Sequence, residues 1–124
     1  MDNKSTVLGV VIAVLTVGLG YLGYKVGQTL SNMGYNVFGF KRTKPKSKLE
    51  FDVYFQAKNL IKFIQRSDII ISVLPNTKET VNIINKKFLK YMKKKSLLIN
   101  VVRGSSVNEK DLMNTKKIKN LKVM

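Results

Sequence analysis

The chain has 124 residues, the size of one domain, and it carries a formal net charge of +16. It contains no cysteine and no histidine, so it lacks disulfides, thiolate metal sites and the side chain that most often serves as a general acid or base. Only three of its 23 basic residues are arginine (Arg42, Arg66 and Arg103), which favours solvated lysine-rich faces over a nucleic-acid-binding surface.

The predicted elements alternate between strands and helices along the chain. Apolar runs rich in β-branched residues indicate strands, and apolar spacings of three and four indicate helices. Gly34 is expected to end the first helix, and Asn108 to cap the last. The expected strands are 10–17, 35–40, 51–55, 68–74, 96–102 and 119–124, and the expected helices are 25–33, 59–66, a short one in the 80s and 107–117. This order predicts an α/β fold: a Rossmann-type doubly wound parallel sheet with helices on both faces, incomplete at its C-terminal end.

A glycine motif, Gly18-x-Gly20-x-x-Gly23, lies between the first predicted strand and the first predicted helix. In that context Gly18 permits a tight turn, Gly20 allows the backbone to approach a pyrophosphate, and Gly23 allows close packing of helix and strand. The amides of Tyr21 and Leu22 would lie at the helix N-terminus, where partial positive charge favours phosphate. The motif therefore predicts a dinucleotide-binding turn.

A basic cluster follows the second predicted strand, at the position where the adenosine ribose is recognised. Enzymes that use NAD have an acidic residue there, whereas this chain has Lys41, Arg42, Thr43 and Lys44. Cations and a hydroxyl attract a 2′-phosphate that a carboxylate would repel. We therefore expect a preference for NADP, with NAD as the alternative.

The same N-terminal region also allows a membrane hypothesis. No charged residue occurs between Lys4 and Lys25, and the Gly23-x-x-x-Gly27 spacing is compatible with a membrane span. A span would, however, remove the central strand of the predicted sheet. The basic cluster at Lys41 would then match the ribose-binding position only by coincidence. We expect a cytoplasmic protein and keep a small membrane-anchored basic protein as an alternative.

Three segments in order resemble the cofactor domain of the D-isomer-specific 2-hydroxyacid dehydrogenases, closest to the NADP-preferring glyoxylate/hydroxypyruvate reductase branch. They are VGLGYLG, LPNTKETVNIIN and INVVRGSSVNEKDL. The resemblance covers residues 14–124, so we expect these to form a partial dinucleotide-binding domain. Residues 1–13 are expected to be a non-matching lead-in. The resemblance implies hydride transfer between a nicotinamide cofactor and a small 2-oxo or 2-hydroxy acid, and a possible homodimer.

Carried over onto this sequence, the resemblance implies roles for six further residues. Leu74 and Pro75 would lie along the cofactor, and Thr80 would lie near it. Val101 and Val102 would line the nicotinamide side. Arg103, in the N-x-x-R-G pattern, would orient the substrate, and its position after a buried strand agrees with that role because parallel sheets bind ligands at that edge. Its guanidinium can hold a carboxylate or a carbonyl oxygen.

Several features depart from the family's pattern. The family uses a histidine as acid/base, supported by a carboxylate, and this chain has no histidine. We expect the family's substrate domain to be absent from this chain, and Val102 is bulkier than the small residue usual before the arginine. The sequence thus predicts a fragment of a 2-hydroxyacid dehydrogenase, with a non-catalytic dinucleotide-binding module as the alternative.

Overall fold

The structure, a computed structural model, describes residues 11–15, 21–41, 44, 46, 48, 49, 51–101 and 104–124. Its strands are β1 (Val11–Leu15), β2 (Asn36–Lys41), β3 (Asp52–Phe55), β4 (Ile69–Ser72), β5 (Leu97–Asn100) and β6 (Lys122–Val123). Its helices are α1 (Tyr21–Asn32), η2 (Ala57–Asn59, a 3₁₀ turn), α2 (Leu60–Arg66), α3 (Lys86–Lys90) and α4 (Glu109–Lys119).

The six described strands form one parallel sheet in the order β3-β2-β1-β4-β5-β6. This is the strand order of a doubly wound dinucleotide-binding sheet, so the predicted fold class is confirmed. β1 lies in the middle of the sheet, where Leu15 pairs with Phe40 on β2 and with Ser72 on β4. Such a strand is covered on both faces, which explains why the sequence of β1 is apolar throughout.

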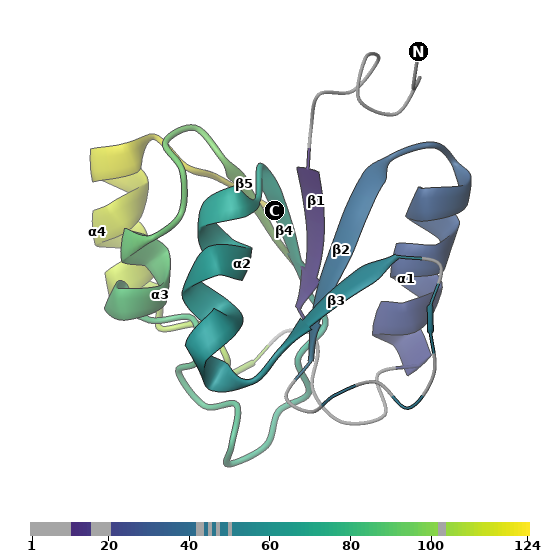
Figure 1. Ribbon diagram of the computed structural model, residues 1–124. Coiled ribbons are helices and arrows are strands. Elements are labelled where there is room, and N and C mark those ends of the chain that lie inside the picture. Colours follow the sequence, from purple (N-terminus) through teal and green to yellow (C-terminus); the bar gives the residue numbers. More distant parts are fainter. Residues whose placement is uncertain are drawn as a thin grey trace.

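The helices cover the two faces of the sheet unequally (Figure 1). α1 contacts β1 and β2 on one face, whereas α2 contacts β1, β2 and β3 on the other. α3 and α4 lie against each other on the same side as α2. This arrangement confirms the prediction of helices on both faces. Among the described elements, three α-helices lie on one face and one lies on the other.

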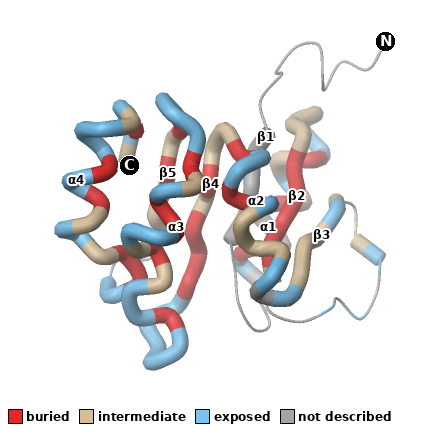
Figure 2. Tube along the Cα trace, turned by 60° about the vertical axis from the view of Figure 1, so that its left-hand side comes forward, coloured by how far each residue is buried: buried red, intermediate tan, exposed pale blue. Residues whose placement is uncertain are grey.

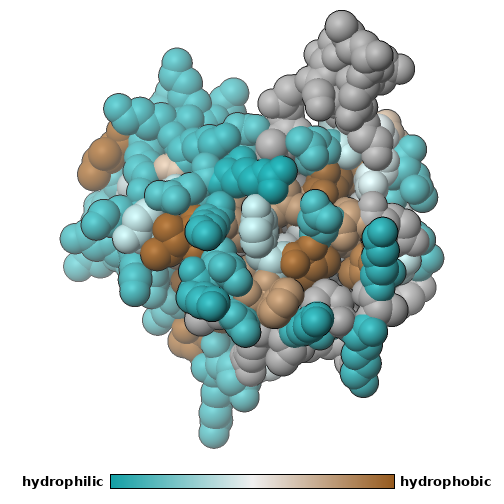
Figure 3. Space-filling view, viewed as in Figure 1, coloured by the Kyte–Doolittle hydropathy of each residue, from teal (hydrophilic) through white to brown (hydrophobic). Residues whose placement is uncertain are grey.

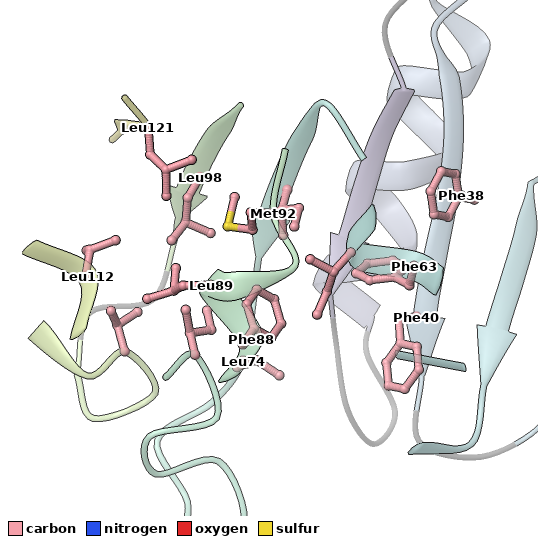
Figure 4. Close-up of a cluster of buried hydrophobic side chains, with 14 residues drawn as sticks. Phe38, Phe40, Phe63, Leu74, Phe88, Leu89, Met92, Leu98, Leu112 and Leu121 are labelled. Carbon is pink, nitrogen blue, oxygen red and sulfur yellow. The ribbon is translucent and has the colours of Figure 1, made fainter. Parts of the chain in front are cut away.

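The larger core lies on the face covered by α2, α3 and α4 (Figure 4). Phe38 and Phe40 of β2 pack around Phe63 of α2, with ring centroids 5.5 and 5.4 Å from that of Phe63. Further along the sheet the cluster continues through buried aliphatic side chains to Leu121 before β6. Buried residues follow β2 and β4 through the centre of the chain trace in Figure 2.

The smaller core lies beneath α1, where Val26 and Leu30 pack against the buried Val37 and Val73. Close contact here depends on Gly27, since a Cβ at that position would lie only 2.5 Å from Cζ of Phe51. The helix ends at Asn32, and Gly34 follows with φ = 97°, so the predicted glycine stop is confirmed.

α4 holds both ends of the short helix α3. Asp111 of α4 accepts a hydrogen bond of 2.8 Å from the backbone N of Lys86, the first residue of α3. Lys119 donates from Nζ to the carbonyl oxygen of Lys90 and, at 2.6 Å, to that of Met92. A five-residue helix is too short to be stable alone. These contacts satisfy backbone groups that α3 cannot satisfy itself.

The predicted elements differ from the observed ones mainly in their ends. The strand predicted at 96–102 ends at Asn100, and the strand predicted at 68–74 ends at Ser72. Asn108 does cap α4, since its side chain accepts from the backbone N of Asp111. Met33, the last residue of the first predicted helix, follows α1 in the structure and is 65% exposed.

The membrane hypothesis receives no support from the structure. β1 occupies part of the uncharged run as a strand paired on both sides. Across the part of the chain that the structure describes, no helix is both long enough and apolar enough to span a bilayer.

Candidate functional site

Four strands of the parallel sheet have their carboxyl ends along one side of the sheet, which we call its carboxyl-end edge. The strand order reverses direction here, between β1 and β4. From β1 the strand order runs outward in both directions, to β2 and β3 on one side and to β4, β5 and β6 on the other. The carboxyl ends here are Leu15, Lys41, Ser72 and Asn100. Loops that leave the sheet at such a point diverge and create the crevice in which open α/β sheets bind ligands.

The N-terminus of α1 follows the carboxyl end of β1 at this edge. The helix begins at Tyr21, as predicted for the dinucleotide turn, and its first turn contains no acidic side chain. Leu22 is half exposed, whereas Gly23 is buried. In general, the backbone N–H groups of a helix's first turn have no partners within the helix, which makes such a turn a common binding site for anions.

Lys41 is the last residue of β2 and is partly exposed. It lies beside Phe55, the last residue of β3, in the parallel register of the two strands. The predicted ribose-binding position therefore lies at the same edge of the sheet as the start of α1. Several other predicted site residues lie outside the described residues: Gly18, Gly20, Arg42, Thr43, Val102 and Arg103.

The loop after β4 is fixed by its own side chains. Leu74 is fully buried in the larger core, while Pro75 is exposed. Thr80 is also fully buried, and its hydroxyl donates to the carbonyl oxygen of Pro75 and accepts from the backbone N of Thr77 at 2.9 Å. The side chains of Leu74 and Thr80 therefore stabilise this loop from inside, whereas Pro75 is exposed at its surface.

Two polar side chains at the ends of β4 and β5 were not singled out by the sequence analysis. Ser72 and Asn100 are register partners, and Ser72 Oγ and Asn100 Oδ1 are buried atoms without a hydrogen-bond partner among the described residues. Such atoms are costly unless a polar group reaches them. The signal that could have identified them is a polar residue at the carboxyl end of each otherwise apolar strand.

Val101 follows β5 at this edge and is half exposed. Its backbone N donates to the carbonyl oxygen of Ser72 at 2.9 Å, which continues the pairing of β5 with β4 by one residue. The side chain of Val101 is thus an exposed apolar group at the carboxyl end of the sheet, and the resemblance implies that it lines the nicotinamide side.

The site residues present fit a dinucleotide. They combine a helix N-terminus without acidic residues, a cation at the end of the second strand and unsatisfied buried polar atoms at the sheet edge. Elsewhere hydrophilic residues cover most of the face shown in Figure 3, with small apolar areas between them. This agrees with lysine-rich solvated faces.

Comparison with known proteins gives one family. The model of the D-isomer specific 2-hydroxyacid dehydrogenase NAD-binding domain matches residues 10–124. A glyoxylate/hydroxypyruvate reductase A from Citrobacter koseri is 36% identical over 105 residues, which are 82% of this chain and 33% of the relative. The chain thus spans about a third of the length of the curated relatives it matches.

Solved structures agree with the sequence relatives. A D-isomer specific 2-hydroxyacid dehydrogenase from Xanthobacter autotrophicus, crystallised with NADPH and MES, has a TM-score of 0.78 and 30% identity. The match covers 91% of this chain and 48% of that one. An NADPH-dependent glyoxylate/hydroxypyruvate reductase from Sinorhizobium meliloti has a TM-score of 0.77 and 28% identity, covering 90% of this chain and 44% of that one.

Proposed function

Because this chain belongs to the D-isomer specific 2-hydroxyacid dehydrogenase family and forms its NAD-binding domain, we propose that it binds NADP(H) for the reduction of a small 2-oxo acid. Because its relatives are named glyoxylate/hydroxypyruvate reductase and glyoxylate reductase, we propose glyoxylate or hydroxypyruvate as the substrate. The observation that carries the proposal is that α1 starts after the carboxyl end of β1, at the same end of the sheet as Lys41, the last residue of β2.

The first turn of α1 is the proposed pyrophosphate site. The backbone N–H groups of Tyr21, Leu22 and Gly23 would donate to phosphate oxygens, and the helix dipole would add favourable charge. Gly18 and Gly20 are assigned to the turn that lets the backbone approach the pyrophosphate. The exposure of Leu22 and the absence of acidic residues in this turn support the assignment.

The residues after β2 are proposed to select NADP over NAD. The segment from Lys41 to Lys48 contains five lysines or arginines and no acidic residue. Lys41 and Arg42 would pair with the 2′-phosphate, and the Thr43 hydroxyl would donate to it. The Xanthobacter neighbour crystallised with NADPH supports this choice.

At the other end of the site, Arg103 is proposed to orient the substrate. The bound dihydronicotinamide supplies the hydride in this chemistry. The guanidinium of Arg103 would hold the carboxylate or the carbonyl oxygen of the 2-oxo acid and stabilise the negative charge that develops on that oxygen. Pro75, Val101 and Val102 would form the wall along the cofactor, and the main chain at Leu74 and Thr80 would complete it.

The chain supplies the arginine but no imidazole acid, since it has no histidine. A missing general acid costs roughly 10²–10⁴ in rate. We therefore expect cofactor binding without detectable glyoxylate turnover by the 124-residue chain. This absence favours the second candidate function, a non-catalytic dinucleotide-binding module. Detectable turnover would exclude that candidate.

Titration of the purified chain with NADPH and with NADH, followed by nucleotide fluorescence, tests the cofactor assignment. We expect Arg42→Asp to weaken NADPH binding by tenfold or more relative to NADH, which is about what the loss of one charge-assisted hydrogen bond produces. Lys117→Asp is the matched control, because it makes the same charge change at an exposed position of α4.

Each outcome of the titration has a defined meaning. Equal weakening of NADPH and NADH by Arg42→Asp would remove the 2′-phosphate assignment. If neither nucleotide binds at millimolar concentration, the cofactor proposal is wrong for this chain. Sedimentation of the same samples checks the homodimer that the family resemblance implies, and fractionation of expressing cells checks the expected cytoplasmic location.

A further inference from the structure

The loop after β4 and the turn after β5 are tied together at the ligand-binding edge of the sheet. The side chain of Asn76 accepts a hydrogen bond from the backbone N of Ser105, with 3.1 Å between Oδ1 and N. Behind it, the backbone N of Asn82 donates to the carbonyl oxygen of Ser105 at 2.7 Å, and that of Ile84 donates to the carbonyl oxygen of Ser106 at 2.8 Å. Of these three hydrogen bonds between the two segments, the one from Ser105 to Asn76 involves a side chain, and the other two join backbone groups.

Gly104 leaves room for the Asn76 amide. Its φ is 138°, a conformation that side-chain-bearing residues rarely adopt, and a Cβ there would lie 2.0 Å from Oδ1 of Asn76. Both the backbone conformation and the space therefore require glycine at this position. The Asn76 amide fills the volume beside Gly104 and accepts a hydrogen bond from the backbone N of the next residue, Ser105.

Asn76 itself is anchored from both sides. Thr80 is fully buried, and its hydroxyl joins the carbonyl oxygen of Pro75 to the backbone N of Thr77, the two chain neighbours of Asn76. The amide is thus carried by a fixed loop and not by a free surface turn. An interaction between two fixed segments loses less conformational entropy than one between mobile segments.

We propose that Asn76 is a positioning residue for Arg103: its hydrogen bond to Ser105 fixes the Gly104–Ser105 turn, which follows Arg103 directly in the chain, and thereby limits the conformations open to the arginine. This inference rests on the proposed role of Arg103 in orienting the substrate. Asn76 acts through the turn and need not touch the substrate. A misplacement of a substrate-orienting group by about 1 Å can lower an enzyme's rate about a hundredfold.

Two substitutions separate the hydrogen bond from the volume of the side chain. Asn76→Leu keeps approximately the volume but removes the acceptor, whereas Asn76→Asp keeps an acceptor oxygen at the same place. Asn114→Leu is the matched control, since Asn114 is exposed on α4. All variants are made in the full 124-residue chain, whose size suits ¹⁵N NMR.

The first measurement is amide exchange at Ser105 together with the backbone order parameter at Arg103. For Asn76→Leu we expect exchange at Ser105 to accelerate about three- to tenfold, as one ordinary hydrogen bond implies. We also expect the order parameter at Arg103 to fall by roughly 0.1 to 0.2 from a rigid value of about 0.85. Asn76→Asp and Asn114→Leu should retain the wild-type values. An unchanged order parameter at Arg103 in Asn76→Leu overturns the proposal.

The second measurement is oxalate binding to the chain saturated with NADP⁺, followed at the Arg103 side-chain Nε resonance. Asn76→Leu should raise the oxalate Kd about three- to tenfold, for the same loss of one hydrogen bond, while the NADPH Kd stays within about twofold of wild type. A purely structural role would instead weaken both ligands together, and that result also overturns the proposal.

The two measurements distinguish failure of this inference from failure of the proposed function. If the wild-type chain does not bind oxalate through Arg103, the substrate role is wrong for this chain. The exchange and order-parameter comparison still decides whether Asn76 orders the Arg103 backbone. If wild type binds oxalate and Asn76→Leu binds it equally well, Arg103 retains its role and Asn76 loses its own.

Discussion

The two faces of the sheet differ in how completely they are buried. The face under α2, α3 and α4 holds a continuous core with many fully buried side chains, including Phe63, Ile70 and Leu98. Among the residues whose burial the structure describes, the hydrophobic cluster under α1 has two buried members, Val37 and Val73, surrounded by half-buried apolar side chains. Neighbouring residues of one strand, Ile70 and Ile71, lie on these opposite faces.

This difference indicates that the stability of the fold and the proposed cofactor site depend on different parts of the molecule. More of the buried apolar residues that the structure describes lie on the larger-core face, and buried apolar area is the dominant favourable contribution to folding. The helix proposed to bind the pyrophosphate lies on the other face. Substitutions in the larger core should therefore affect stability most, and those beneath α1 should affect stability less.

Ile70→Ala should have the largest effect. The side chain is fully buried on β4, so its truncation removes buried methyl groups and leaves a cavity in a closed core. We expect a loss of roughly 3 to 5 kcal/mol in the free energy of unfolding. Urea denaturation followed by circular dichroism measures it, and a loss below about 1 kcal/mol would contradict the larger core as described.

Ile71→Ala is the matched substitution on the opposite face. The same atoms are removed one residue further along β4, but the side chain is only half buried. We expect about half the loss found for Ile70→Ala, roughly 1 to 2.5 kcal/mol. Equal losses at the two positions would show that the face under α1 is as well packed in solution as the other face.

Lys119→Met tests how α4 supports α3 on the larger-core face. The substitution keeps the apolar stem and removes the donor to the carbonyl oxygens of Lys90 and Met92, so we expect a loss of about 1 to 2 kcal/mol in unfolding free energy. Denaturation of both proteins provides the measurement. An unchanged stability would mean that α3 does not need this contact.

The same pair of proteins gives a pH dependence. Burial, followed by repulsion from Lys94, lowers the pKa of Lys119 from 10.5. Between the lowered pKa and 10.5 the unfolded chain binds more protons at this site than the folded chain, so the contribution of Lys119 to stability rises with pH. The stability advantage of wild type over Lys119→Met should therefore increase as the pH rises through that interval. A decrease would reverse the assigned sign.

Asp68→Asn should have the smallest effect. Asp68 and Lys93 form an ion pair of 3.0 Å whose side chains are 33% and 43% exposed. Exposed ion pairs contribute little because solvent and salt screen them, so we expect a change of about 0.5 kcal/mol or less. A loss comparable to that of Ile71→Ala would mean that charge pairing, and not only apolar burial, distinguishes the two faces.

Much of the fold could be predicted from local patterns. Apolar runs identified β1, β4 and β5, and the alternation of strands with helices implied parallel pairing, which the structure confirms. Asn108 and Gly34 were predictable because capping depends on a few adjacent residues. The start of α1 and the position of Lys41 at the end of β2 followed from the glycine motif and its spacing.

The remaining features depend on contacts between segments that are distant in sequence. Asn76 and Ser105 are separated by 29 positions, and nothing in the sequence near either one identifies the other as its partner. Likewise Gly27 is required by Phe51, and the burial of Thr80 follows from how its loop folds back on Pro75. Such pairings appear only when the chain is placed in space.

The strand order also sets a sequence of events for a chain made from its N-terminus. β1 comes first among the described strands, and it pairs with β2 on one side and with β4 on the other. β2 ends at Lys41, but β4 is complete only at Ser72, 31 residues later (72 − 41). At typical synthesis rates those residues take roughly 2 to 6 s to be added. During that interval one edge of an apolar strand has no partner from its own sheet. A growing chain must therefore protect β1 from pairing with other exposed strands until β4 emerges.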